Sequence, residues 1–145
     1  MGCAAGRGLV IGGVALAALA TSLARPVSAE EAGALVTVPS GREVRWIDTI
    51  SDAPGPDGLT LRFRFLVPGL GAPVWQEAPE RAEADMQALC DGFALPRLAT
   101  VGPRPAQVVI SLSDRVLPFG EVDETAVQFF EAYSVANGTC EWELF

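Results

Sequence analysis

The 145-residue chain contains no histidine and no lysine, so all ten of its basic residues are arginine. Without those two residue types it has no Ser-His-Asp or Cys-His triad, no histidine-ligated metal, no Ser-Lys dyad and no Schiff-base lysine. Eighteen acidic residues give a formal net charge of -8, whereas a nucleic-acid-binding surface needs a basic footprint. The sequence therefore predicts an acidic, soluble protein with no nucleic-acid partner and no cofactor.

The N-terminus has the pattern of a secretory signal peptide. Arg7 precedes an uncharged run rich in Ala, Leu, Gly and Val, and Val27-Ser28-Ala29 supplies the small residues of a cleavage site. We expect a signal peptide (residues 1–29) and a single periplasmic or secreted domain (residues 30–145) with no membrane contact after cleavage. The alternative is a retained membrane anchor, for which the uncharged run is short.

Cysteine is scarce, and only Cys90 and Cys140 remain once Cys3 leaves with the signal peptide. Two cysteines in an exported chain are most simply a disulfide, because the compartment is oxidising. Closing a loop of about 50 residues stabilises the fold by roughly 4 kcal/mol. A redox-active pair is the alternative, but the two residues do not form a C-x-x-C motif.

Alternating apolar residues predict the strands of a sheet. The clearest strand covers residues 59–67, in which Arg62 and Arg64 face away from the apolar side. Residues 44–50 alternate imperfectly, because Asp48 falls on the apolar face. A loop rich in Pro, Gly and Asp joins these two segments, which predicts a long hairpin. Further strand candidates are residues 36–38, residues 108–112 and a C-terminal hairpin of residues 133–135 and 139–144 that turns at Asn137-Gly138.

Two segments have helical patterns. A first helix begins near Pro79, carries Met86 and Cys90 on one apolar face, and ends at Gly92 as a left-handed terminating residue. Residues 123–130 predict a second, short helix capped by its first residue. The fold class that follows is α+β, with a mostly antiparallel sheet and one or two helices packed on one face.

Three side chains are candidates for binding a ligand or partner. Arg62 and Arg64 form a possible anion-binding patch, because arginine grips carboxylate and phosphate groups with two hydrogen bonds. Pairing with the many acidic side chains would explain both arginines equally well. Trp75 lies in an irregular segment and could contact a ligand, whereas Trp46 and Trp142 sit in strands where packing explains them.

Carboxylates offer the remaining chemistry. Asp52 and Asp57 lie in the loop before the clearest strand and could hold calcium, although their spacing matches no calcium motif. Asp114, Glu121 and Asp123 follow a strand and could act as paired acid and base in a small hydrolase. Eighteen acidic residues also produce close pairs by chance, so we expect no metal site and no catalytic pair.

Five segments of the chain together form a family-like pattern: Pro56–Phe65 (PDGLTLRFRF), Asp85–Cys90 (DMQALC), Val109–Arg115 (VISLSDR), Gln128–Tyr133 (QFFEAY) and Cys140–Trp142 (CEW). With these segments the chain resembles a family of small exported bacterial proteins known only as a domain of unknown function. The resemblance implies an exported domain with paired cysteines, and it implies no activity, cofactor or catalytic residue.

The sequence predicts the function chiefly by exclusion. We expect a non-catalytic periplasmic binding or interaction module, stabilised by one disulfide, whose partner is an envelope protein or a small ligand. The alternative is a small hydrolase that depends on the carboxylates of Asp114, Glu121 and Asp123.

Overall fold

The computed structural model describes residues 1–2, 33–51, 53–55, 58–73, 78–98 and 104–144. The predicted signal peptide lies outside these ranges except for its first two residues, and Asp52, Asp57 and Trp75 also lie outside them. Within the described ranges, no helix is long and apolar enough to cross a membrane.

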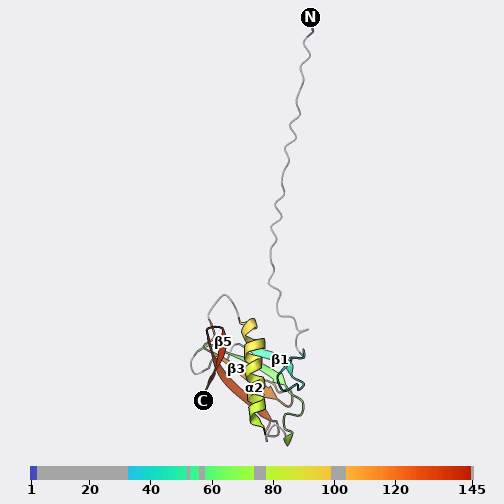
Figure 1. Cartoon of the computed structure of the whole chain (residues 1–145), viewed down its shortest axis with the longest axis vertical. Coiled ribbons are helices and arrows are strands. Elements are labelled where there is room, and N and C mark those ends of the chain that lie inside the picture. The colour runs from blue at the N-terminus through green and yellow to red at the C-terminus, as the bar shows by residue number, and fades with distance from the viewer. Residues whose placement is uncertain (3–32, 52, 56–57, 74–77, 99–103, 145) are drawn as a thin grey trace.

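A five-stranded sheet and one α-helix dominate the described part of the chain (Figure 1). In chain order the elements are β1 (Arg45–Ile50), β2 (Thr60–Leu66), α2 (Pro79–Leu89), the π-helical turn η2 (Cys90–Ala94), the 3₁₀ turn η3 (Leu95–Arg97), β3 (Gln107–Ser113), β4 (Gln128–Ala136) and β5 (Thr139–Glu143). The strands lie side by side in chain order, and every neighbouring pair is antiparallel except β2 and β3. The predicted α+β fold with a mostly antiparallel sheet is confirmed.

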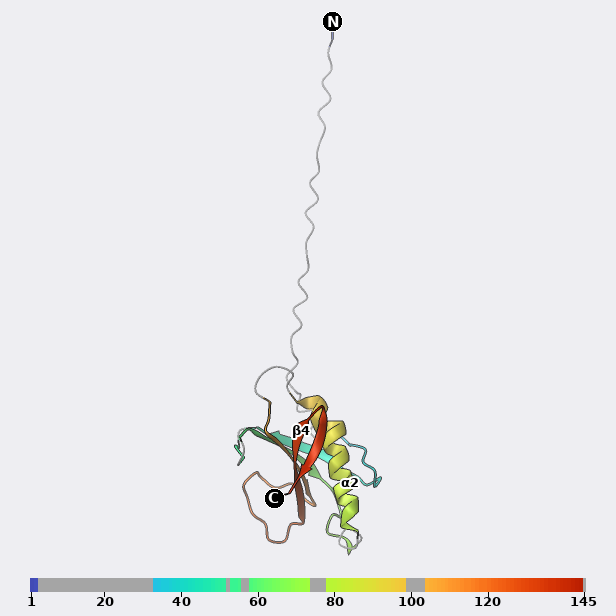
Figure 2. The same cartoon turned by 60° about the vertical axis from the view of Figure 1, so that its left-hand side comes forward.

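The hydrophobic core contains residues of both the sheet and α2, which appear next to each other in Figures 1 and 2. Met86 and Leu89 of α2 belong to the same buried cluster as Phe63 and Phe65 of β2. Successive side chains of a strand point to opposite faces. Arg62 and Arg64, which alternate with these phenylalanines on β2, therefore point away from the core, as the sequence predicts.

The helical segment does not end at Gly92, which corrects the prediction. Gly92 is not among the residues with positive φ, and the chain continues through η2 and η3 to Arg97. A π-helical turn accommodates an extra residue, and here it brings Phe93 into the core. The ring of Phe93 packs at centroid distances of 5.7, 6.3 and 5.3 Å against Trp46, Phe63 and Phe65. Burial of this ring favours continuation over termination at the glycine.

The second predicted helix, residues 123–130, is wrong. Asp123 accepts hydrogen bonds from the backbone N–H (2.8 Å) and hydroxyl (2.6 Å) of Thr125, which closes a turn and not a helix. β4 then begins at Gln128, whose backbone pairs with Ser113 of β3. Hydrogen bonding to the neighbouring strand outweighs the local helical pattern. The aromatic residues that follow also favour a strand.

The imperfect alternation of residues 44–50 results from a β-bulge. The register between β1 and β2 shifts between Trp46, which pairs with Phe65, and Asp48, which pairs with Arg64. A bulge inserts one extra residue and re-aims the side chains that follow it. Trp46 therefore stays in the core, while Asp48 moves to the face that carries the arginines.

The short strand predicted for residues 36–38 is also wrong. Pairing with the start of β1 involves residues 33–36 and not 36–38: Leu35 bridges to Arg45, and the Val36 N–H donates to the Val44 carbonyl (2.8 Å). Val38 enters the core, and the chain then turns at Gly41, whose N–H donates to the Val38 carbonyl (3.0 Å). The turn that follows Val38 ends the pairing, so residues 36–38 form no strand.

The C-terminal hairpin and the disulfide are both confirmed. β4 and β5 turn at Asn137-Gly138, with positive φ at both residues. Cys90 and Cys140 are bonded at 1.96 Å and join the end of α2 to β5. Beside the disulfide, the Cys140 N–H donates to Asp91 (3.0 Å) and the Cys140 carbonyl accepts from the Gln87 side chain (3.0 Å). These bonds satisfy backbone groups of an edge strand, where unpaired groups invite aggregation.

Candidate functional site

Cross-strand pairing gathers a second set of side chains on the sheet face that carries Arg62 and Arg64. Arg62 pairs with Val109 and Arg64 with Ser111, and Ser111 in turn pairs with Phe130 of β4. Directly paired residues point to the same face of a sheet. All five line a cleft of about 420 Å³.

The connection between β3 and β4, residues 114–127, forms the other wall of this cleft and is called here the 114–127 loop. It contributes Leu117, Pro118, Phe119, Gly120 and Glu121 to the lining. At its tip the Glu121 N–H donates to the Pro118 carbonyl (3.1 Å), and Gly120 has a φ of 87°. Glycine adopts this conformation without strain at the third position of a turn.

Arg64 fastens the loop to the sheet. Its side chain is only 12% exposed, and its Nη2 donates to the carbonyl of Leu117. Its Nε lies 3.5 Å from Oδ1 of Asp48, the residue that the bulge has moved to this face. Within the described residues that oxygen accepts no hydrogen bond. The guanidinium of Arg64 therefore interacts with both β1, through Asp48, and the 114–127 loop, through Leu117.

Arg62 interacts with the loops on either side of it without forming an ion pair to a described residue. Its Nη1 donates to the carbonyl of Ala53 (3.3 Å), and its guanidinium carbon lies 5.9 Å from the ring centroid of Phe119. That distance suits a cation–π contact. Among the ion pairs formed by described residues, none involves Arg62. This arginine brings to the cleft a positive charge that forms no ion pair with a described carboxylate.

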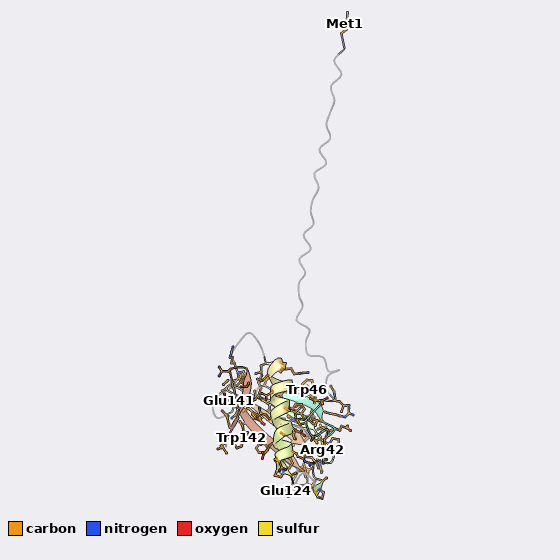
Figure 3. The ribbon with its side chains drawn as sticks, viewed as in Figure 1. Met1, Arg42, Trp46, Glu124, Glu141 and Trp142 are labelled. Atoms are coloured by element: carbon orange, nitrogen blue, oxygen red, sulfur yellow. A yellow bond between two sulfur atoms is a disulfide. The ribbon has the colours of Figure 1, made fainter. Side chains whose placement is uncertain are left out.

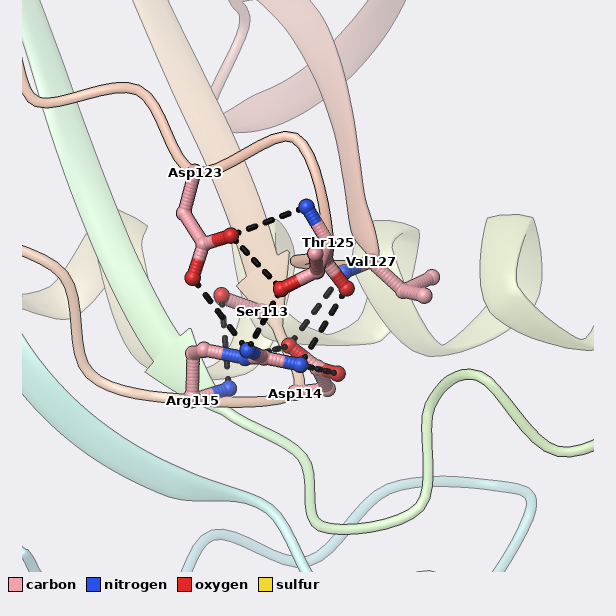
Figure 4. A network of polar contacts seen from close by, with 6 residues as sticks. All are labelled: Ser113, Asp114, Arg115, Asp123, Thr125 and Val127. Atoms are coloured by element: carbon pink, nitrogen blue, oxygen red, sulfur yellow. Dashed lines mark hydrogen bonds and ion pairs between the residues drawn. The ribbon is translucent and has the colours of Figure 1, made fainter.

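The base of the 114–127 loop is closed by a polar network around Arg115 (Figure 4). Nε of Arg115 donates to Oδ1 of Asp114 and Nη2 of Arg115 donates to Oδ2, both at 3.0 Å. A further nitrogen reaches Asp123 (3.2 Å) and the hydroxyl of Thr125 (3.0 Å). The Val127 N–H donates to Asp114 (3.2 Å). Both ends of the loop are thus tied to one guanidinium.

This network bears on the predicted catalytic carboxylates. The hydrogen bonds from Arg115 lower the pKa of Asp114, and those from Thr125 lower the pKa of Asp123. A general acid needs a raised pKa in order to hold a proton near neutral pH. Asp114 and Asp123 both pair with Arg115. Glu121 is not part of this network; it is exposed and lines the cleft. The arrangement favours closure of the loop over acid–base chemistry.

Neutralising Asp114 tests the network. Because the folded-state pKa of Asp114 lies below its ordinary value of 3.8, its ionised form stabilises the fold above pH 3.8, and this stabilisation is lost as the pH falls through the folded-state pKa. Asp114→Asn should lower the melting temperature at pH 7, and the difference from the unsubstituted protein should shrink in strong acid. Differential scanning fluorimetry from pH 7 to pH 2.5 measures this. Glu124→Gln, in the same loop, is the control and should change the melting temperature little. A difference that stays constant with pH would contradict the prediction.

Of the three tryptophans, the two that the structure describes, Trp46 and Trp142, do not line the cleft. Trp75, Asp52 and Asp57 lie outside the described residues, so their predicted roles stay untested. Trp46 is buried, and its ring N–H donates to the Asp48 carbonyl (3.0 Å). Trp142 is 54% exposed on β5, away from Trp46 in Figure 3.

Sequence reasoning missed the apolar half of the cleft. Phe119 is 51% exposed in the loop and Phe130 is 60% exposed on β4, whereas the sequence pattern predicted that Phe130 ends a short helix. The signal that could have identified the loop is the run Val116–Gly120, which is apolar and contains a Pro-Phe-Gly turn between charged segments.

Comparison with known proteins identifies the family of this chain. Neither the curated proteins nor the solved structures contain a protein that matches this chain. One family model matches residues 16–145, which is nearly the whole chain, and it describes a family of unknown function (DUF6497). The chain therefore belongs to this family of unknown function.

Proposed function

We propose that this protein is a non-catalytic binding module, and that the cleft between β2–β4 and the 114–127 loop is its ligand site. The observation that carries the proposal is the composition of the cleft, which combines Arg62 with the exposed rings of Phe119 and Phe130. Ligand sites are typically concave and mostly apolar, with a few placed polar groups. In this proposal α2 covers one face of the sheet and leaves the opposite face for the ligand.

We also propose that the module works outside the cytoplasm, in the periplasm or as a secreted protein. The N-terminal pattern of residues 1–29 and the disulfide between Cys90 and Cys140 both support export. Intact-mass analysis of the protein purified from its native envelope should give a chain that begins at Glu30 and is two hydrogens lighter than its reduced form. A mass that includes Met1 would contradict cleavage.

Blocking the cleft tests the binding site. Ser111 lies on the cleft floor, so Ser111→Trp should fill it and abolish binding of the neutral dye Nile red. The unsubstituted protein should raise the fluorescence of the dye. Thr37→Trp, which adds the same side chain at an exposed position outside the cleft, should bind like the unsubstituted protein. Equal dye binding by all three proteins, with unchanged melting temperatures, would overturn the proposed site.

A further inference from the structure

Two arginines line the cleft of a protein that is acidic overall. The chain has a formal net charge of -8, and the charged residues that line the cleft are Arg62, Arg64 and Glu121. Arg64 is paired with Asp48, so the positive charge open to a ligand is that of Arg62, which forms no ion pair with another described residue. Such an arginine suits a ligand with a single negative charge.

Of the two arginines, Arg62 is the one that can receive the anion. Arg64 already donates to Leu117 and pairs with Asp48. A guanidinium has five N–H donors, and in the described structure Arg62 uses one of them, toward Ala53. The donors that remain suit the two oxygens of a carboxylate, which arginine binds in bidentate fashion.

The rest of the cleft is suited to an apolar body. The ring of Phe119 stands beside the guanidinium of Arg62, and Phe130 lies on the cleft floor two strands away. Phe119 and Phe130 are both more than half exposed, so an apolar chain laid across them would remove apolar surface from water. The volume of about 420 Å³ is that of a site for a small molecule.

We propose that the cleft binds a free amphiphile with one negatively charged head, of the class of medium-chain carboxylates, with its head on Arg62 and its chain along Phe119 and Phe130. This inference rests on the proposed function and adds the chemical class of the ligand. An anionic lipid in a bilayer presents a similar head and chain, so the experiment includes it as a separate arm.

Three probes of equal chain length isolate the charge. Isothermal titration calorimetry below the micellar concentration should show decanoate binding at least about tenfold more tightly than decanol, and decyltrimethylammonium binding more weakly than either, because charge-assisted hydrogen bonds are stronger than neutral ones. Arg62→Met should reduce the affinity for decanoate by about tenfold or more and reduce that for decanol by less, because the carboxylate loses the stronger interaction. Arg104→Met removes an exposed arginine outside the cleft and should change neither affinity.

The outcomes separate this inference from the proposed function. Equal affinities for decanoate and decanol overturn the anionic ligand class while leaving the cleft as a binding site, and this comparison needs no variant. Failure of all three probes together with Nile red overturns both proposals. Co-sedimentation with vesicles containing phosphatidylglycerol, dependent on Arg62 and without binding of decanoate, overturns the free amphiphile in favour of a bilayer.

Discussion

Removing the disulfide through the double substitution Cys90→Ala and Cys140→Ala should lower the free energy of unfolding by about 4 kcal/mol. The two cysteines are 50 residues apart, so the bond restricts a long segment of the unfolded chain, and both side chains are buried in the folded protein. Urea unfolding followed by tryptophan fluorescence measures the difference between the variant and the oxidised protein.

A reductant provides the matched control for this prediction. Dithiothreitol should lower the unfolding midpoint of the unsubstituted protein and leave that of the double variant where it is. The side-chain hydrogen bonds of Gln87 and Asp91 to the Cys140 backbone do not depend on the disulfide, so β5 should stay docked in the folded variant. A loss below about 1 kcal/mol would show that the disulfide contributes little to stability.

Phe93→Ala should lower the free energy of unfolding by about 3–5 kcal/mol. The ring of Phe93 is the centre of the aromatic cluster, since three other rings pack on it. The guanidinium of Arg97 covers it at 3.5 Å from the centroid and also donates to the Phe93 carbonyl (3.0 Å). Truncation would leave a cavity whose walls are held by the sheet on one side and by the helical segment on the other.

The same substitution at an exposed phenylalanine is the control. Phe119→Ala removes a ring that is 51% exposed in the 114–127 loop, and it should cost less than about 1 kcal/mol. Denaturant unfolding of both variants gives the comparison. Similar losses at the two positions would contradict the central role of Phe93 in the core.

Much of the fold could be predicted from local pattern. The alternation of residues 59–67 predicted β2 and the outward side of Arg62 and Arg64, and both are confirmed. The start of α2 at Pro79 and the turn at Asn137-Gly138 are confirmed as well. In each case the physical cause is local, because a strand, a helix start or a tight turn depends on residues that are close in the sequence.

The cleft could be predicted only in part. The sequence identified its cationic half through Arg62 and Arg64, because outward arginines on a strand are visible in the period of the pattern. Its apolar half depends on where the 114–127 loop folds and on which neighbour β4 takes. The contact of Phe119 with Arg62 joins segments that are far apart in the sequence, and no local period reports such a contact.

The sequence by itself determined the local elements of this protein: which segments alternate, where α2 begins, and which two cysteines of the proposed exported domain can pair. Only the tertiary structure decided that β1 carries a bulge that moves Asp48 to Arg64, that residues 128–130 extend β4, and that the helical segment continues past Gly92 to bury Phe93. The physical reason is that local propensities differ by about 1 kcal/mol or less per residue, whereas pairing with a neighbouring strand or burying an aromatic ring contributes more.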